Sequence, residues 1–416
     1  MVDSIFVSRI GENAMTAVML SFPVMNMVIA LGVGTGTGLG TVISRALGEK
    51  KRETVNAAAE NAIWIYSIYG LCFMAFAVFG AEAFIRTQTD NSAVIGEAVT
   101  YLKIVSFFSC ITMYQIMFGK FFQSTGYAFY SMITQASGAL VNIILDPVLI
   151  FGGGGIPAMG VKGAALATVI GKVTALGISC RFHVRKNEEI HIDIRKITQP
   201  NKVIIKKIYD VGIPSIIMMS IGSVMTYLMN LILLSFSVTA TAFFGIYFRL
   251  QSIVFMPIFG MNNGLIPIIS YNYGSQRKDR ILEALKKSML FAVSTMALGM
   301  ALFWIMPEKL LDLFHASSQM KAFGIRALRV ISLSFPLAAV GITTGAVNQA
   351  LSKSIYSLVI SVVRQLVVLI PVAYLLSLRR EIGLIWWAFP IAEMASFLLS
   401  ILFFRKIYRD KIAVMQ

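Results

Sequence analysis

The sequence has few of the residues on which common enzymatic and metal-binding chemistry depends. Its 416 residues include three cysteines and three histidines. The cysteines lie inside apolar segments without CxxC spacing, so neither a disulfide framework nor a zinc site is indicated. No HExxH or DxxD-type metal motif occurs. We therefore expect no enzymatic activity and no resident cofactor.

Charged residues are scarce as well. They make up 13% of the chain, whereas hydrophobic residues make up 57%, far more than a soluble domain needs to fill its core. The net charge of +16 could suggest nucleic acid as a partner. However, the basic residues are spread over short loops between long apolar runs instead of forming one face. The composition predicts a polytopic membrane protein whose partner is the lipid bilayer, not nucleic acid.

The apolar segments are long enough to cross a bilayer. A spanning helix needs about 20 apolar residues. Eleven segments reach or approach this length, and a short fragment at residues 1–9 precedes them. We expect the spans at 14–42, 54–80, 95–119, 129–151, 160–182, 208–235, 240–270, 284–306, 323–350, 354–377 and 383–404.

One stretch occurs twice. Residues 34–52 match residues 260–278 at a constant offset of 226, with six identities in fifteen positions, and further matches follow at the same offset. The pairs are Gly34 and Gly260, Gly38 and Gly264, Leu39 and Leu265, Ile43 and Ile269, Ser44 and Ser270, Gly48 and Gly274, Gln123 and Gln349, and Tyr130-Ser131 and Tyr356-Ser357. Half of the chain is therefore duplicated. Both copies end an apolar helix and enter a basic loop, which predicts a parallel repeat with its axis along the membrane normal.

The repeat also explains the fragment at the start. Shifting the segment 208–235 back by 226 residues places its counterpart at −18 to 9. The chain as given would then lack most of one spanning helix. We interpret this as a misplaced start codon or a real truncation.

Lys and Arg residues are distributed unevenly between the two sides of the predicted membrane. One side carries 23 of the 36, the other about 10, and Lys172, Arg249 and Arg364 fall within spans. By the positive-inside rule, the basic loops and the C-terminus are cytoplasmic. The long polar stretch 181–207 lies where the duplication predicts a boundary. The predicted organisation is an N-terminal lobe at 1–186, a cytoplasmic linker at 187–207 and a C-terminal lobe at 208–416.

Asp146 is the strongest functional candidate among the ionisable residues inside spans. Each such residue costs about 2.5–3.5 kcal/mol at the bilayer centre. Asn142 lies one turn earlier on the same helix face. Pro147 removes one backbone hydrogen bond and displaces the carbonyl of Ile143, which leaves an oxygen near the carboxylate. This pattern predicts a proton or hard-cation site. The alternative is a kinked helix in which Asp146 caps loose backbone groups.

Asp3 is predicted to lie at the same depth as Asp146. Counted from the outer helix ends at about 1.5 Å per residue, both lie roughly 8–9 Å below the outer surface. Two carboxylates at one level can share a proton, or can hold a sodium ion together with Asn142. The alternative for Asp3 is a helix-end residue near the interface.

The other ionisable residues within spans are predicted to be structural. For Lys172, Arg249, Arg364 and Glu393 we expect ion pairs between helices. The first five helices of the second half contain no deep acidic residue. We therefore expect cation coupling to belong to the first lobe.

Several segments together resemble the multidrug and toxic compound extrusion (MATE) family of cation-coupled exporters. They are VDSIFVSRIGENAMTAV, GTGLGTVISRALGEKKRE, NIILDPVLIF followed by IPAMGVKGAALATVI, and VGIPSIIM after the linker. The resemblance covers essentially the whole chain in the same order. It implies an all-α fold of twelve helices, two lobes of six, around a central cavity, with about eleven complete spans here. It also implies that Asp3, Asn142 and Asp146 form the proton or sodium site, and the nearest match to a threonine of that site is Thr168.

The function that this resemblance implies is secondary antiport. We expect a monomer in the plasma membrane that exports organic, cationic and amphipathic compounds in exchange for protons or sodium. Asp3, Asn142 and Asp146 would be metal ligands only if sodium is the coupling ion. The alternatives are a lipid-linked saccharide flippase of related architecture, which should have several basic residues in its cavity, and a non-functional truncated transporter.

Overall fold

The structure is a computed structural model that describes residues 2–153 and 155–415, with side chains from Ile5 onward. Within these ranges the ordered elements are helices, apart from one isolated bridge between Gly153 and Ile156. The predicted all-α fold class is confirmed. Long apolar runs can satisfy their backbone groups in lipid only as helices or closed barrels, and the helical solution is the one adopted.

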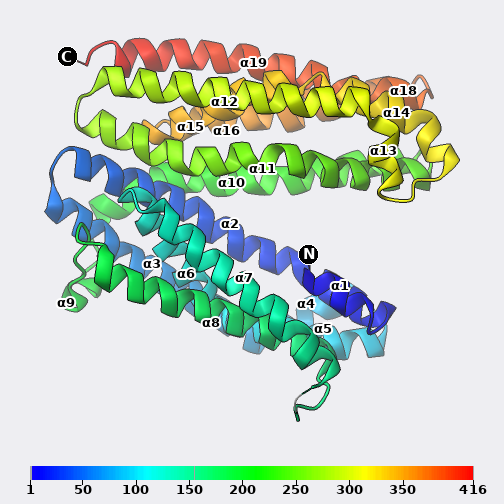
Figure 1. The fold of residues 1–416 in the computed structure, drawn as a ribbon, viewed down its shortest axis with the longest axis horizontal. Coiled ribbons are helices and arrows are strands. Elements are labelled where there is room, and N and C mark those ends of the chain that lie inside the picture. The colour runs from blue at the N-terminus through cyan, green and yellow to red at the C-terminus, as the bar shows by residue number, and fades with distance from the viewer. Residues whose placement is uncertain (1, 154, 416) are drawn as a thin grey trace. The chain divides into compact units, whose positions relative to one another are not determined.

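The helices form two compact units (Figure 1). The first unit comprises the chain up to Leu47 together with Lys51–Ile208, and the second comprises Gly48–Lys50 together with the chain from Tyr209 onward. The helices that begin before Tyr209 are α1 (Val2–Ser8), α2 (Glu12–Gly48), α3 (Arg52–Phe79), α4 (Ala81–Arg86), α5 (Ser92–Phe107), α6 (Ser109–Ser124), α7 (Ala128–Phe151), α8 (Gly160–Lys186), α9 (Ile194–Ile197) and α10 (Lys202–Leu234). Those that follow are α11 (Val238–Gly274), α12 (Lys278–Ile305), α13 (Pro307–Asp312), α14 (Ser318–Ser332), α15 (Phe335–Ala350), α16 (Ser354–Val362), η1 (Val363–Leu369), α17 (Ile370–Ser377), α18 (Ile382–Ile385), α19 (Ala388–Ile407) and η2 (Tyr408–Ile412).

Up to eleven of the described helical segments can cross a membrane. Nine are long and apolar enough as they stand, and two bent pairs bring the number to eleven. The bent pairs correct two predictions, because the spans expected at 95–119 and 323–350 are not continuous helices. Helices α5 and α6 meet at 45°, and so do α14 and α15. At the second bend, the Ser334 hydroxyl donates to the carbonyl of Ile331, and Pro336 supplies no backbone donor.

The duplication predicted from the sequence is confirmed by the helix boundaries. Adding 226 to the bounds of α2 and α3 gives the bounds of α11 and α12. Lys50 and Gln276, which are one offset apart, follow the first helix of each pair with φ values of 58° and 57°. Helix α1 ends at Ser8, and α10 ends 226 residues later at Leu234. Each unit therefore folds as a copy of the same helical arrangement.

The stretch between α8 and α10 is fastened to α3. Three side chains near the start of α3 accept hydrogen bonds from backbone N–H groups of this stretch. The pairs are Asn56 with His191 (2.9 Å), Glu60 with Asp193 (3.2 Å) and Asn61 with Asn201 (2.7 Å). Asn201 in turn caps α10 by accepting from the N–H of Val203 at 3.0 Å. Helix α10 thus begins at Lys202, six residues before the start of the predicted span at 208.

Candidate functional site

Glycines bring α7 and α8 into close contact. A Cβ added at Gly138 would lie 2.8 Å from the carbonyl oxygen of Gly171, and one added at Gly171 would lie 2.7 Å from the carbonyl oxygen of Gly138. Nearer the hairpin turn, Gly163 packs directly on the backbone carbonyl of Leu149. Small residues allow such approach in lipid, where interhelical association depends on packing. These contacts fix the α7 segment that carries Asn142 and Asp146 against α8.

Asp146 lies in the interior of the first unit. Its side chain is 0% exposed. The amide Nδ2 of Asn142 donates a hydrogen bond to Asp146 Oδ1 at 3.2 Å. Ile144, on the other face of α7, is exposed. The predicted pairing of Asn142 and Asp146 on one helix face is therefore observed, and that face is turned into the unit.

A hydrophobic cluster closes the site on one side. Ile150, one turn after Asp146, belongs to a buried cluster supplied by α1, α2, α5, α7 and α8. Its members are Val7, Ala14, Val18, Tyr101, Ile150, Val161, Ala164 and Ala165. A charge placed one turn away from such a core is expensive unless it has polar partners.

The remaining predicted site residues lie on elements that border this face. Helix α1 packs against α7 and α8, and Phe6 makes an edge contact with Phe151 at 6.5 Å. Asp3 is part of α1, but its side chain lies outside the described residues. Thr168 is half-buried on α8, three residues from Gly171, and its hydroxyl donates to the carbonyl of Ala164 at 3.0 Å.

The structure separates the other ionisable residues into different roles. Arg364 Nη1 lies 2.7 Å from Glu393 Oε1, so the predicted ion pair between helices is confirmed for these two residues. The same prediction is wrong for Arg249, which is exposed and has no ion-pair partner among the described residues. Arg249 shares the exposed side of α11 with Ile253, where a long side chain can extend toward polar surroundings. Lys172 is half-buried on α8.

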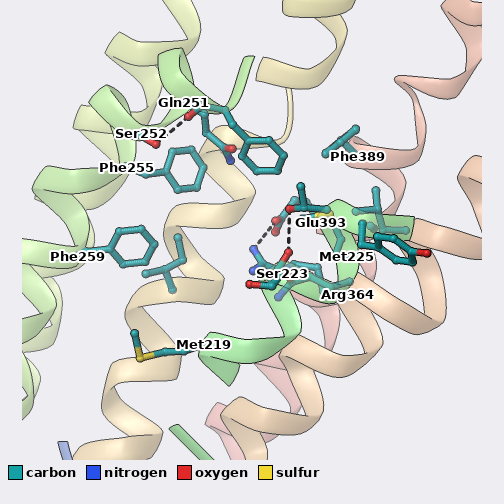
Figure 2. Close-up of a pocket in the computed structure, with 18 of the residues that line it drawn as sticks. Met219, Ser223, Met225, Gln251, Ser252, Phe255, Phe259, Arg364, Phe389 and Glu393 are labelled. Carbon is teal, nitrogen blue, oxygen red and sulfur yellow. Dashed lines mark hydrogen bonds and ion pairs between the residues drawn. The ribbon is translucent and has the colours of Figure 1, made fainter. Parts of the chain in front are cut away.

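A pocket in the second unit is a site that sequence reasoning missed. It has a volume of about 800 Å³ and is bounded by α10, α11, α15, η1 and α19. Figure 2 shows Arg364 and Glu393 on one wall, with the rings of Phe255 and Phe259 across from them. The polar lining residues are Ser223, Thr226, Asn230, Gln251, Ser252, Arg364, Gln365 and Glu393. The available signal was the presence of Arg364 and Glu393 in apolar segments, but the sequence does not define the direction in which each helix face points.

The two units differ at corresponding positions of their shared fold. Polar residues of each unit correspond, at the offset of 226, to small or apolar residues of the other. The pairs are Asn142 with Val368, Asp146 with Val372, Gly138 with Arg364 and Ala167 with Glu393. The first unit therefore has a buried acid beside a close glycine contact, whereas the second has an ion pair beside a pocket.

Comparisons with known proteins agree with this arrangement. The MatE family model matches residues 1–148 and 214–375, which is one match in each repeat. Among curated relatives, the multidrug export protein MepA of Staphylococcus saprophyticus is 27% identical over 410 residues, covering 98% of this chain and 89% of that protein. MepA of Staphylococcus aureus is 26% identical over 403 residues, covering 97% and 88%.

Solved structures show the same fold. The outward-facing conformation of a multidrug resistance MATE family transporter superimposes with a TM-score of 0.91 at 24% identity, covering 98% of this chain and 91% of that one. A MOP superfamily transporter from Pyrococcus furiosus gives a TM-score of 0.87 at 24% identity, covering 100% and 91%. With both repeats matched by the family model, the chain belongs to the MatE family of membrane transporters.

Proposed function

We propose that this protein is a secondary active exporter that removes several organic, amphipathic compounds from the cell in exchange for protons or sodium. The names of the MepA relatives support export of multiple drugs. The observation that carries the coupling is the fully buried carboxylate of Asp146, to which Asn142 donates a hydrogen bond. A buried carboxylate inside a membrane protein is costly as long as its charge is uncompensated. Binding of a proton or a small cation neutralises that charge.

The proposed site has unequal contributors. Asp146 supplies the charge that the coupling ion neutralises, and Asn142 orients that carboxylate. Thr168 and Asp3 are proposed to complete the site from α8 and α1, two of the helices that pack against α7. For sodium, oxygen atoms of Asp146, Asn142 and Asp3 would serve as ligands, which suits a hard cation.

Coupling follows from the way in which α7 is held. The backbones of α7 and α8 are in close contact at Gly138 and Gly171, so little space separates the two helices. A change of charge at Asp146 must therefore be accommodated by a change in how these helices pack. A ligand shifts a conformational equilibrium only through its different affinity for the two states. The coupling ion is proposed to favour the packing of the first unit that holds substrate weakly.

The proposed setting is the plasma membrane, with the basic loops and the C-terminus on the cytoplasmic side. The excess of Lys and Arg on that side supports the orientation. The proposed functional form is a monomer organised as two lobes, 1–186 and 208–416, joined by the segment 187–207. An exporter of this orientation takes its substrate from the cytoplasm or the inner leaflet.

Efflux by cells that express the full chain tests this function. Ethidium export is followed in energised cells that produce the original protein, Asp146→Asn or Asp90→Asn at equal levels. Asp90 is an exposed residue before α5 and gives a matched removal of one acid. We expect Asp146→Asn to abolish export and Asp90→Asn to retain it. Normal export by Asp146→Asn would overturn the assignment of the site.

A further inference from the structure

The pocket of the second unit contains a guanidinium that is only partly used. Arg364 Nη1 donates to Glu393 Oε1 at 2.7 Å. Among the residues that the structure describes, the other N–H groups of Arg364 have no partner. An arginine has five such donors in a planar fork that matches a carboxylate. The Arg364 side chain is 27% exposed, and it is part of the pocket lining.

The acidic partner is less accessible than the arginine. The side chain of Glu393 is 12% exposed, and its Oε2 is buried without a hydrogen-bond partner. A ligand that enters the pocket therefore meets the guanidinium before it meets the carboxylate. The accessible charge of the pocket is positive, and it favours an oxyanion on the ligand.

The local backbone holds Arg364 at the pocket. Residues Val363–Leu369 form a π-helical turn inside the span Ser354–Ser377. Such turns insert an extra residue into a helix and are frequent at functional sites. In the first unit, the residue that corresponds to Arg364 is Gly138, which lies in close backbone contact with α8. The second unit has a long cationic side chain at the position where the first unit has helix packing.

The rest of the pocket fits a flat apolar body. The Phe255 ring packs edge-on against Phe335, with centroids 5.3 Å apart, and lies 6.4 Å from Phe259. Met219, Met225 and Met256 also line the pocket, and methionine adapts to ligands of varied shape. A cavity of about 800 Å³ is in the size range of sites for drug-sized molecules.

We infer that this pocket binds aromatic carboxylates, with the ligand carboxylate on the unused N–H groups of Arg364 and the aromatic body against Phe255 and Phe259. Glu393 keeps the guanidinium in position from the other side. The inference adds aromatic carboxylates to the compounds that the proposed exporter would carry. Export of these ligands rests on the proposed function, whereas their binding to the pocket does not. Binding at the pocket is measured without transport, so failure of one proposal does not imply failure of the other.

Calorimetric titration of the purified full chain in detergent tests this inference. Three probes share a naphthalene body: 1-naphthylacetate, the neutral 1-naphthylacetamide and the cationic 2-(1-naphthyl)ethylammonium. We expect the carboxylate to bind most tightly. Arg364→Gln should weaken carboxylate binding at least tenfold and leave the amide within about twofold, because only the charge-assisted hydrogen bonds are lost. Arg249→Gln, the same change at the exposed arginine of α11, should bind all three probes like the original protein.

Two further variants separate the roles of charge and shape. Glu393→Gln should bind the carboxylate at least as tightly as the original, because a like charge has been removed. Gly222→Leu fills the pocket and should weaken both acid and amide. If Arg364→Gln does not fold, the double variant Arg364→Gln and Glu393→Gln leaves no unpaired charge and should still discriminate poorly between acid and amide. Unchanged carboxylate affinity without Arg364, tightest binding of the ammonium probe, or no binding of the carboxylate at millimolar concentration would overturn the inference.

Discussion

Ser44 donates its hydroxyl to the backbone carbonyl of Ser124, 80 residues away, at 3.0 Å. Ser270 makes the same bond to the carbonyl of Ala350, at the same separation and distance. The acceptor residue is a serine in one unit and an alanine in the other. The bond is nevertheless the same in length and sequence separation, because the acceptor atom is a backbone carbonyl oxygen. Packing contacts of this kind are common to the two units. The residues that distinguish their functions are those at which the two copies differ.

Asn142 is one such residue, and its replacement tests the proposed site without removing the acid. Asn142→Val gives the first unit the residue found at position 368 of the second. It removes the hydrogen bond to Asp146, and hydrogen bonds to charged groups contribute about 1.5–3 kcal/mol. The proton or sodium concentration for half-maximal efflux should therefore change by roughly 10- to 100-fold, measured from initial export rates.

The matched control for Asn142 lies on the same helix. Ser137 donates its hydroxyl only to the carbonyl of Ile133 within α7. Ser137→Ala should leave the ion dependence of export as it is in the original protein. An Asn142→Val protein with the original ion dependence would remove Asn142 from the site.

Gly171 provides a test of the α7–α8 contact. Gly171→Ala would place a Cβ 2.7 Å from the carbonyl oxygen of Gly138 and 3.0 Å from Asn142 Cβ. The helices must move apart, and overpacking of this kind costs about 1–3 kcal/mol. Thermal unfolding in detergent should show a lower midpoint, and export should fall because Asn142 is displaced.

Gly177 supplies the comparison for this change. It lies on the same helix with no atom within 4 Å of an added Cβ. Gly177→Ala should unfold at the same temperature or a higher one, since alanine favours the helix over glycine by about 1 kcal/mol. Equal midpoints for the two alanine variants would contradict the close contact described for α7 and α8.

The attachment of the segment after α8 to α3 predicts a local effect on proteolysis. Asn61→Ala removes the 2.7 Å hydrogen bond that its side chain accepts from the N–H of Asn201. The loss of about 1 kcal/mol of local stability should raise the opening of this segment roughly fivefold. Trypsin should then cut faster after Arg195 and Lys196. Asn272→Ala, at a half-buried residue whose side chain donates only to the carbonyl of Ile268 in its own helix, should be cut at the original rate. An equal rate for both variants would argue against the attachment.

Much of the architecture follows from the sequence because it depends on periodic or repeated features. Apolar run lengths define the spans, and the offset of 226 relates the two halves of the chain. The pairing of Asn142 and Asp146 is also predictable, since residues four apart share a helix face. These features need no knowledge of how helices face one another.

Other features depend on contacts between distant helices and were not predictable in this way. No proline or glycine lies next to the bend between Phe107 and Ser109, so the local sequence does not predict it. Arg364 and Glu393 are 29 residues apart, and their meeting depends on the rotation of two helices and on a π-helical turn. For the same reason, the sequence did not indicate that Arg249 is exposed whereas Arg364 lines a pocket.

The most direct test of the account is gradient-driven accumulation in proteoliposomes that contain the purified full chain. An imposed proton or sodium gradient should drive ethidium uptake by the original protein and by Asp90→Asn. Asp146→Asn should show no gradient-driven uptake while it still exchanges labelled for unlabelled ethidium across the membrane, because its substrate site is intact and only coupling is lost. Gradient-driven accumulation by Asp146→Asn at the original rate would contradict the assignment of Asp146 as the coupling residue.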